Sequence, residues 1–334
     1  MASIDTPVRP GRRSFTGRRL RPADALLQGV AAIAATSAAV LVGLIAYKLV
    51  RDAWPAISRY GIAFVAHDIW DPVANHYGAA SFLFGTVLTS VFALAIAGPL
   101  AIAIALYLTE LAPRALRGPV TALVETLAAI PSVVIGLWGI LVLGPFLAHH
   151  VEPWLHSALG FIPLFGSPST GPQSIFTAIV VLTIMILPIV ASICRELFLS
   201  VPRELKEGAL ALGTTRWEMI RAVVFPYARG GIAAALILGF GRAIGEAIAV
   251  TQVVGGGTII QANLFSGGDT LASKIAASYQ GADSNIQVAA LIYLGLILLV
   301  FSLVVNLLAQ WVVRQFGRGQ GAVSRASARV GATA

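Results

Sequence analysis

Cysteine and lysine are nearly absent from this chain of 334 residues, and charged residues together make up only 11% of it. The single cysteine, Cys194, excludes an internal disulfide and offers no metal cluster with the usual ligand spacing. The three lysines, Lys48, Lys206 and Lys274, all lie outside the glycine-rich pattern G-x-x-x-x-G-K-S/T. The chain therefore lacks the usual cradle for nucleotide phosphates, and we expect it to carry no cofactor of its own.

Long polar stretches are missing as well. The interruptions between apolar runs, about 51–78, 148–173, 201–228 and 255–287, are too short to form an independent hydrophobic core. Hydrophobic residues make up 57% of the chain and its mean hydropathy is +0.84, which leaves too much apolar surface for a single water-soluble core. We therefore expect no appended enzyme domain, and a lipid bilayer is the natural solvent.

What the chain has instead is six long apolar runs, at roughly 23–50, 79–109, 119–147, 174–200, 229–254 and 288–313. Each run is long enough to cross about 30 Å of hydrocarbon as an α-helix. The sequence therefore predicts an all-α polytopic membrane protein with about six transmembrane helices. One membrane domain over 23–315 follows a basic N-terminal segment, 1–22, and precedes a C-terminal tail, 316–334.

Basic residues alternate from loop to loop. The N-terminal segment, the second and fourth interhelical loops and the tail hold eighteen lysines and arginines, whereas the odd-numbered loops hold only Arg51, Arg59 and Lys274. The positive-inside rule then places both termini in the cytoplasm. The net charge of +8 thus reflects orientation in a cell inner membrane and contact with its lipid, and we expect no binding to nucleic acid.

The first external segment, 51–78, mixes aromatic with charged residues. Its larger aromatic residues include Trp54, Phe64 and Trp70. This composition predicts an interfacial helix whose aromatic side chains sit at the depth of the lipid headgroups. Docking of an external partner is the alternative.

The second external segment, 148–173, contains three histidines, His149, His150 and His156. They look at first like metal ligands, but four prolines and no cysteine accompany them. We therefore interpret this segment as a solvated loop.

A proline interrupts the third apolar run. The stretch E-T-L-A-A-I-P-S begins at Glu125, contains Pro131 and ends at Ser132. Proline removes a helical hydrogen bond and bends or breaks the helix, and a broken helix in a membrane often lines a cavity. We therefore expect a cavity beside this break.

The loop between the fourth and fifth runs reads as two short helices. Pro202 suits the start of the first helix, and Gly213 suits a left-handed stop. Thr215 followed three residues later by Glu218 forms a capping-box pattern for the second helix. Pro226 is then expected to separate this helix from the fifth membrane span.

Each of these two helices has one apolar and one charged face. The apolar positions at helical spacing are Leu205, Ala209 and Leu212 in the first helix, and Trp217, Ile220 and Val224 in the second. Such a unit fits a groove on a partner protein. The alternative is an amphipathic loop that lies on anionic lipid through its basic residues.

Two opposite charges lie inside the fifth apolar run. Arg242 stands about thirteen residues, or roughly 20 Å, past the start of that run, and Glu246 follows four residues later. A charge near the membrane midplane costs on the order of 2.5–3.5 kcal/mol, so both side chains should face protein or water, on one helix face. The pair is either a salt bridge that orients the helix or the resting state of an anion site.

The chemistry of this pair bears on which anion it suits. A guanidinium offers several donors to an oxyanion, whereas a neighbouring carboxylate repels an anion that brings no proton. Phosphate near neutral pH keeps one proton and sulfate does not, so the pair suits phosphate better. Gly241 and Gly245 add a G-x-x-x-G pattern, which predicts close helix packing rather than a dinucleotide loop.

The loop between the fourth and fifth runs is similar to the EAA loop of ATP-binding-cassette (ABC) importer permeases. The corresponding positions are Glu207, Gly208, Ala209, Gly213 and Pro226. Three residues depart from the family's usual pattern, namely Gly208, Val223 and Phe225, and they soften the first helix while keeping size or polarity. The resemblance implies that this loop couples the chain to a cytoplasmic ATPase.

Together with E-T-L-A-A-I-P-S at 125–132 and G-R-A-I-G-E at 241–246, this loop makes residues 25–315 resemble the PstC permeases of bacterial phosphate-specific transporters. The longer first external segment favours PstC over the related PstA. The resemblance implies a MetI-like permease fold, a PstA-like permease partner, PstB-like ATPases that bind ATP, and an external phosphate-binding protein. It also implies that phosphate passes the side chains of Arg242, Glu246, Glu125 and Ser132.

Three other functions stay open from the sequence. An ABC permease for another oxyanion, such as molybdate or sulfate, would differ in the charged pair of the fifth run. A secondary transporter or channel would show internal repeats with broken-helix pairs in both halves, and we find no convincing repeat. A membrane signalling subunit would use the basic tail after Arg314 to bind a regulator, although that tail suits a lipid surface equally well.

Overall fold

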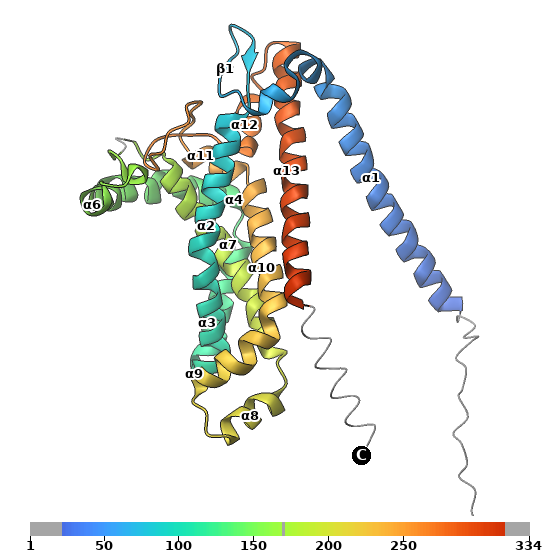
Figure 1. Ribbon diagram of the computed structural model, residues 1–334, viewed down its shortest axis with the longest axis vertical. Helices are drawn as coiled ribbons and strands as arrows, with labels where there is room; N and C mark the ends of the chain where they lie inside the picture. The colour runs from blue at the N-terminus through green and yellow to red at the C-terminus, as the bar shows by residue number, and fades with distance from the viewer. Residues whose placement is uncertain (1–21, 169–170, 318–334) are drawn as a thin grey trace, which may run out of the picture. The chain divides into compact units, whose positions relative to one another are not determined.

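The computed structural model describes residues 22–168 and 171–317, and helices dominate it (Figure 1). The basic N-terminal segment and the C-terminal tail lie almost entirely outside the described residues. The first half contains α1 (Pro22–Tyr60), η1 (Gly61–Val65), β1 (Trp70–Asp71), β2 (His76–Tyr77), α2 (Ala80–Leu106), η2 (Tyr107–Leu111), α3 (Arg114–Ala129), α4 (Ser132–Trp138), η3 (Gly139–Leu143), α5 (Gly144–Phe146), η4 (Leu147–Val151), α6 (Glu152–Leu159) and η5 (Pro163–Phe165). The second half contains α7 (Ile175–Leu199), α8 (Arg203–Ala211), α9 (Arg216–Met219), η6 (Ile220–Val224), α10 (Phe225–Gly245), α11 (Ile248–Val253), α12 (Leu271–Ser278) and α13 (Asn285–Gly317).

Six helical stretches of the described chain are long and apolar enough to cross a membrane. They are Leu26–Val65, Ala80–Leu111, Ser132–Leu159, Ile175–Leu199, Arg216–Gly245 and Asn285–Trp311. This confirms the prediction of about six transmembrane helices, although the bounds of the first, third and fifth differ from the predicted ones.

The chain divides into two compact units inside α1, after Lys48. In the first unit, the described part of α1 exposes apolar side chains such as Leu26, Ile33 and Leu41. A helix satisfies its own backbone hydrogen bonds, so such an apolar surface is stable in hydrocarbon. This part of α1 therefore has the surface of a lipid-facing helix.

In the second unit, α7 forms the centre and packs against α2 and α10, while α13 packs against α10. Four alanines spaced four residues apart along α2 are fully buried: Ala93, Ala97, Ala101 and Ala105. Small residues at this spacing let two helix backbones approach closely, which replaces the hydrophobic drive that lipid cannot supply. Cys194 of α7 is also fully buried in this core, where it serves as a packing residue.

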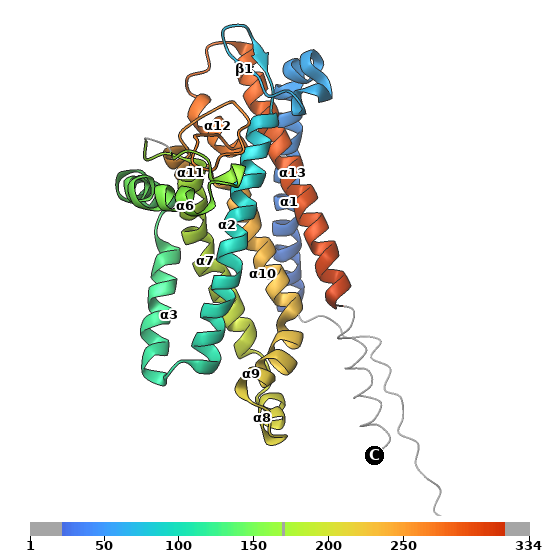
Figure 2. The same cartoon turned by 60° about the vertical axis from the view of Figure 1, so that its left-hand side comes forward.

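Strands β1 and β2 form an antiparallel hairpin at one end of this unit, and α8 lies at the other end (Figures 1 and 2). We call these the hairpin end and the α8 end. The hairpin end has its own aromatic core, in which Phe64 stacks on Tyr293 at 4.5 Å and Trp70 meets Tyr77 at 4.8 Å between ring centroids. The predicted interfacial helix is therefore wrong for Phe64 and Trp70, because these rings are buried against the bundle.

A buried ion pair packs against Trp70 of the hairpin. The Nζ atom of Lys274 in α12 lies 3.7 Å from Oδ2 of Asp269 and over the rings of Trp70 and Phe82, at 5.6 and 5.4 Å from their centroids. Ser273 donates a hydrogen bond to Oδ1 of Asp269 at 3.1 Å. Burial raises the pKa of the Asp269 carboxyl, and this effect outweighs the opposing influence of Lys274.

The second external segment is mostly helical, so its interpretation as a solvated loop is wrong. The helical run that starts at Ser132 continues through η3, α5, η4 and α6 to Leu159. The π-helical turn η4 comes just before Pro153 and makes room for a ring that otherwise clashes with the preceding turn. Within this run His149 and His150 are exposed, and Nδ1 of His156 lies 2.9 Å from the carbonyl oxygen of Phe165.

The proline before the fifth span does not separate it from the preceding helix. Helix α9, the π-helical turn η6 and α10 form one helical run from Arg216 to Gly245, and Pro226 lies in the first turn of α10. A π-helical turn widens the helix just before Pro226, which makes room for a ring that otherwise clashes with the preceding turn. The expected separation at Pro226 is therefore wrong.

Candidate functional site

The fifth span breaks beside the charged pair. Helix α10 ends at Gly245, Glu246 has extended backbone angles, and α11 begins at Ile248. The sequence missed this break and predicted one span to residue 254. The Oε2 atom of Glu246 lies 3.9 Å from Nη2 of Arg242, and Oε1 accepts a hydrogen bond from the backbone N–H of Ala249 at 3.3 Å.

The two charges differ in their exposure. The Glu246 side chain is 9% exposed, whereas the Arg242 side chain is 45% exposed. Both line a cavity of about 510 Å³ between α7, α10 and α13. A distance of 3.9 Å is too long for a hydrogen bond, so the guanidinium keeps its donors available to a group in the cavity.

The amide of Asn306 in α13 completes the polar lining of this cavity. Sequence reasoning missed this residue. A carboxamide inside an otherwise apolar run was the signal, because polar groups in a membrane span usually face the protein interior and have a function. The cavity therefore offers a guanidinium, a carboxylate and an amide.

The two glycines of the G-x-x-x-G pattern help to open the cavity. A Cβ added to Gly245 would have nothing within 4 Å, and one added to Gly241 would lie 3.8 Å from the side chain of Asn306. Close helix packing falls instead to Gly239, where an added Cβ would come within 2.7 Å of Val190. Within the described chain, Gly241 and Gly245 therefore do not take the close-packing role predicted for them.

The third span breaks at the predicted proline. Helix α3 ends at Ala129, Ile130 is extended, and α4 begins at Ser132. Glu125 is exposed on α3 and lines a separate small cavity with Arg195 of α7, while Ser132 is half-buried. The structure thus brings Arg242 and Glu246 together, but neither Glu125 nor Ser132 lines their cavity.

The two breaks are linked through the helices that follow them. Helix α4 packs against α11, and a Cβ added to Gly136 would come within 2.8 Å of the Cα of Ala249. One added to Gly139 would come within 2.8 Å of Val253. Glycines at these two positions allow α4 and η3 to pack closely against α11, which places the segments after the two breaks in direct contact.

The predicted pair of short helices lies at the α8 end (Figure 2). Helix α8 follows Pro202 and stops before Gly213, whose φ of +85° is the left-handed conformation that favours glycine. Thr215 and Glu218 form both hydrogen bonds of the capping box that starts α9. These features confirm the local predictions for this loop.

The surface of this pair is suited to a partner. Glu207, Gly208 and Gly213 are exposed and Ala209 is half-buried. Leu212 and Trp217 are 86% and 62% exposed. Apolar side chains gathered on one exposed face mark an interaction surface.

An ion pair ties α8 to the second span. The Nζ atom of Lys206 lies 2.6 Å from Oε1 of Glu110 in η2 and donates another hydrogen bond to the carbonyl of Phe198 at 3.0 Å. Arg216 of α9 donates to the backbone carbonyl of Glu110 at 3.0 Å. Sequence reasoning missed Glu110, because nothing local relates it to a residue 96 positions away.

Comparison with known proteins places this geometry in context. The family model of the binding-protein-dependent transport system inner membrane component matches residues 97–318. The phosphate transport system permease protein PstC of Mesorhizobium japonicum is 39% identical over 95% of this chain and 98% of its own length. PstC of Haemophilus influenzae is 39% identical over 89% of this chain and 95% of its own length.

Solved structures share the fold at lower identity. A chain in the crystal structure of a bacterial alginate ABC transporter in complex with an alginate pentasaccharide-bound periplasmic protein superposes with a TM-score of 0.59, at 20% identity. The match covers 88% of this chain and 95% of that chain. The polytopic helical fold is therefore that of an ABC importer permease.

Proposed function

The chain belongs to the family of binding-protein-dependent transport system inner membrane components, as a PstC-type permease, and we propose that it moves phosphate through the cavity that holds Arg242 and Glu246. It is the membrane-spanning permease subunit of an ABC importer for inorganic phosphate. The observation that carries this conclusion is the 37–40% identity to PstC permeases of several bacteria over most of the chain.

The geometry of the charged pair supports a transient anion site. Glu246 is anchored by the N–H of Ala249, while Arg242 is half-exposed and not hydrogen-bonded to it. An entering phosphate accepts hydrogen bonds from the guanidinium and, through its own proton, donates a hydrogen bond to the carboxylate. Sulfate has no proton to donate and meets only repulsion from Glu246, which gives selectivity at this point.

A single helical run connects this site to the α8 end. Residues from Arg216 to Gly245 form one helix of 30 residues, or about 45 Å, that stops beside Glu246. A displacement of α9 by an ATPase is therefore carried along this helix to the break. The Glu207 to Pro226 segment is the proposed ATPase contact, with Glu207, Gly208, Ala209 and Gly213 at its surface.

An ABC importer permease works with an ATPase and a substrate-binding protein. The proposed partners here are a PstA-like permease, a PstB-like ATPase pair that binds the ATP, and an external phosphate-binding protein. ATP is a cytoplasmic fuel, so the α8 end faces the cytoplasm and the hairpin end faces outward. Both chain termini then lie in the cytoplasm, in agreement with the distribution of basic residues.

Uptake of labelled phosphate tests the proposal in cells that lack the chain and receive it back at matched membrane abundance. Wild type should restore uptake that unlabelled sulfate and molybdate do not inhibit. Arg242→Ala should abolish most uptake, whereas Arg229→Ala, an exposed arginine of the same helix outside the cavity, should not. Persistent uptake by the Arg242→Ala variant would make the pair structural, and inhibition by sulfate or molybdate would reassign the substrate.

A further inference from the structure

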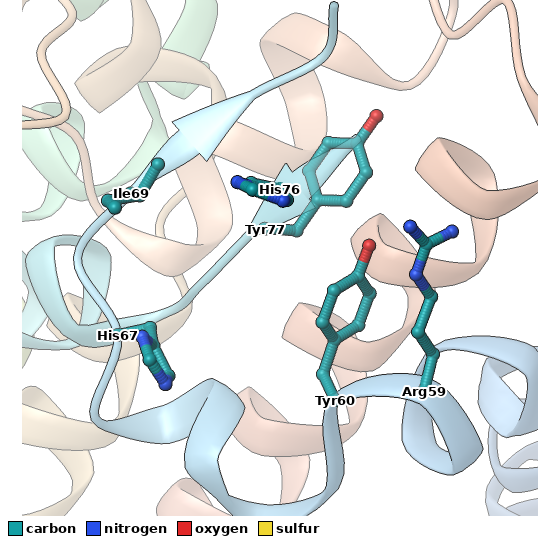
Figure 3. Close-up of a pocket in the computed structure, with 6 residues that line it drawn as sticks. All are labelled: Arg59, Tyr60, His67, Ile69, His76 and Tyr77. Carbon is teal, nitrogen blue, oxygen red and sulfur yellow. The ribbon is translucent and has the colours of Figure 1, made fainter. Parts of the chain in front are cut away.

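The hairpin end contains a second polar cavity, of about 440 Å³. Figure 3 shows its lining: Arg59 and Tyr60 come from the end of α1, His67 and Ile69 from the following loop, and His76 and Tyr77 from β2. Three of these six side chains carry nitrogen groups that donate hydrogen bonds. The proposed phosphate path does not include this cavity.

The three nitrogen-bearing side chains keep hydrogen-bond donors unused among the described residues. Within the described chain, the side chains of Arg59, His67 and His76 make no hydrogen bond or ion pair, and the Arg59 guanidinium lies over the ring of Tyr60 at 5.5 Å from its centroid. The Tyr60 hydroxyl is already engaged, since it donates to the carbonyl of Asn75 at 2.6 Å. The cavity therefore presents unused donors.

No carboxylate lines this cavity. The same loop has two acidic residues, Asp68 and Asp71, but neither is part of the lining. Oδ1 of Asp71 accepts hydrogen bonds from the backbone N–H groups of Val73 and Ala74, at 2.8 and 3.1 Å, which fixes the turn of the hairpin. Donors without an internal acceptor favour an anionic group from outside the chain.

The frame around the cavity is rigid. The backbone N–H of Ala80 donates to the carbonyl of His67 at 2.9 Å, and the N–H of Ala79 donates to the carbonyl of Phe64 at 2.8 Å. Gly78 lies so close to His67 that an added Cβ would overlap its carbonyl group. The backbone that carries His67 is thus fixed before any ligand arrives, which lowers the entropic cost of binding.

Arg59 lies well past the apolar stretch of α1. The apolar stretch of α1 ends at Val50, before Arg51 and Asp52. Arg59 lies nine residues further on, or about 13 Å along the helix. Arg59 is exposed and lies beyond the apolar stretch of its own helix, so it is accessible to a protein that docks on the hairpin end.

We propose that this cavity receives an exposed carboxylate side chain of the substrate-binding protein when that protein docks on the hairpin end. The inference rests on the proposed function, because it needs the hairpin end to face outward. The guanidinium of Arg59 forms the charged half of the contact, and the imidazoles of His67 and His76 supply further donors. Such a rim contact orients the partner and speeds its association.

The test uses the assembled transporter in liposomes, with ATP on the side of the ATPase and increasing concentrations of phosphate-loaded binding protein. Arg59→Gln should raise the half-saturating concentration of binding protein about tenfold, and Arg59→Glu should raise it further, while the maximal uptake rate stays unchanged. His67→Gln combined with His76→Gln should cause a smaller increase. Arg51→Glu is the matched control, since Arg51 is exposed on the same helix outside the cavity.

Each alternative has its own signature. An unchanged half-saturating concentration in Arg59→Glu overturns the proposal. If the uptake defect at saturating binding protein depends on the concentration of free phosphate, the cavity is a phosphate site. If the defect depends on the anionic lipid content of the liposomes, the cavity is a headgroup site. Absence of phosphate uptake by the wild type would instead overturn the proposed function.

Discussion

The contact between Lys206 and Glu110 offers the sharpest test of how α8 is held on the bundle. Its two atoms lie 2.6 Å apart, and the side chains are only 17% and 10% exposed. A hydrogen bond to a charged group is worth about 1.5–3 kcal/mol, and its removal leaves a half-desolvated carboxylate. We take about 2–3 kcal/mol as the cost of Lys206→Met to the local stability of α8.

Hydrogen exchange of the α8 backbone measures this cost directly, because amides of a locally opening helix exchange at a rate set by the opening free energy. At about 1.4 kcal/mol per factor of ten, the α8 amides of the Lys206→Met variant should exchange roughly 30- to 150-fold faster than in wild type. Amides in the middle of α7 should not change. Lys206→Arg keeps the charge and should recover most of the protection.

The control is Glu204→Gln, which removes an exposed carboxylate from the first turn of the same helix. Exchange in Lys206→Met within threefold of wild type would refute the reasoning, since the ion pair would then contribute little. The charge swap of Glu110 and Lys206 should recover protection only in part, because a glutamate at position 206 would face the carbonyl of Phe198.

Coupling, packing and pH dependence give three further tests. Glu207→Lys and Gly213→Asp should abolish the ATPase response to loaded binding protein. In Gly213→Asp the cause is the aspartate, which is strained by about 1 kcal/mol at a φ of +85°. A normal ATPase response in these variants would contradict the coupling role. Gly136→Ala should lower the free energy of unfolding by about 1–3 kcal/mol, and with it the melting temperature in detergent, since the added Cβ would meet the Ala249 backbone. Gly118→Ala is the control and should not lower the melting temperature, because the space around Gly118 is open. Burial raises the pKa of Asp269 above 3.8, so the folded protein holds the carboxyl proton more tightly than the unfolded chain does. The protein therefore loses stability as pH rises through the folded pKa. In this pH range Asp269→Asn should flatten the plot of melting temperature against pH, and equal slopes in the variant and wild type would contradict this.

Local signals in the sequence predicted much of the structure correctly. Six apolar runs predict six spans because a bilayer imposes one length on every crossing helix. Gly213, Thr215 and Glu218 predict the stop of α8 and the start of α9, because capping depends on residues within one turn. The break at Pro131 follows from its missing N–H group alone.

Wrong predictions came where a tertiary contact outweighed a local preference. The segment around His149 continues as helix although it is rich in proline, because the π-helical turn η4 comes before Pro153 and makes room for its ring. Phe64 and Trp70 lie in an aromatic core rather than at the lipid surface, because Tyr293 and Phe82 offer a drier environment. Local composition does not show which partner a side chain will meet.

For the proposed transport site, the sequence by itself determined the residue types and their position along the fifth apolar run. Arg242 and Glu246 had to face protein or water, because the cost of charge in lipid depends only on position along the span. Only the tertiary structure decided that the helix breaks at Glu246, before α11 begins. It also decided that Asn306 lines the cavity of Arg242 and Glu246, whereas Glu125 and Ser132 do not. These outcomes depend on how α7, α10 and α13 pack together, and that packing is set by side chains far apart in the chain.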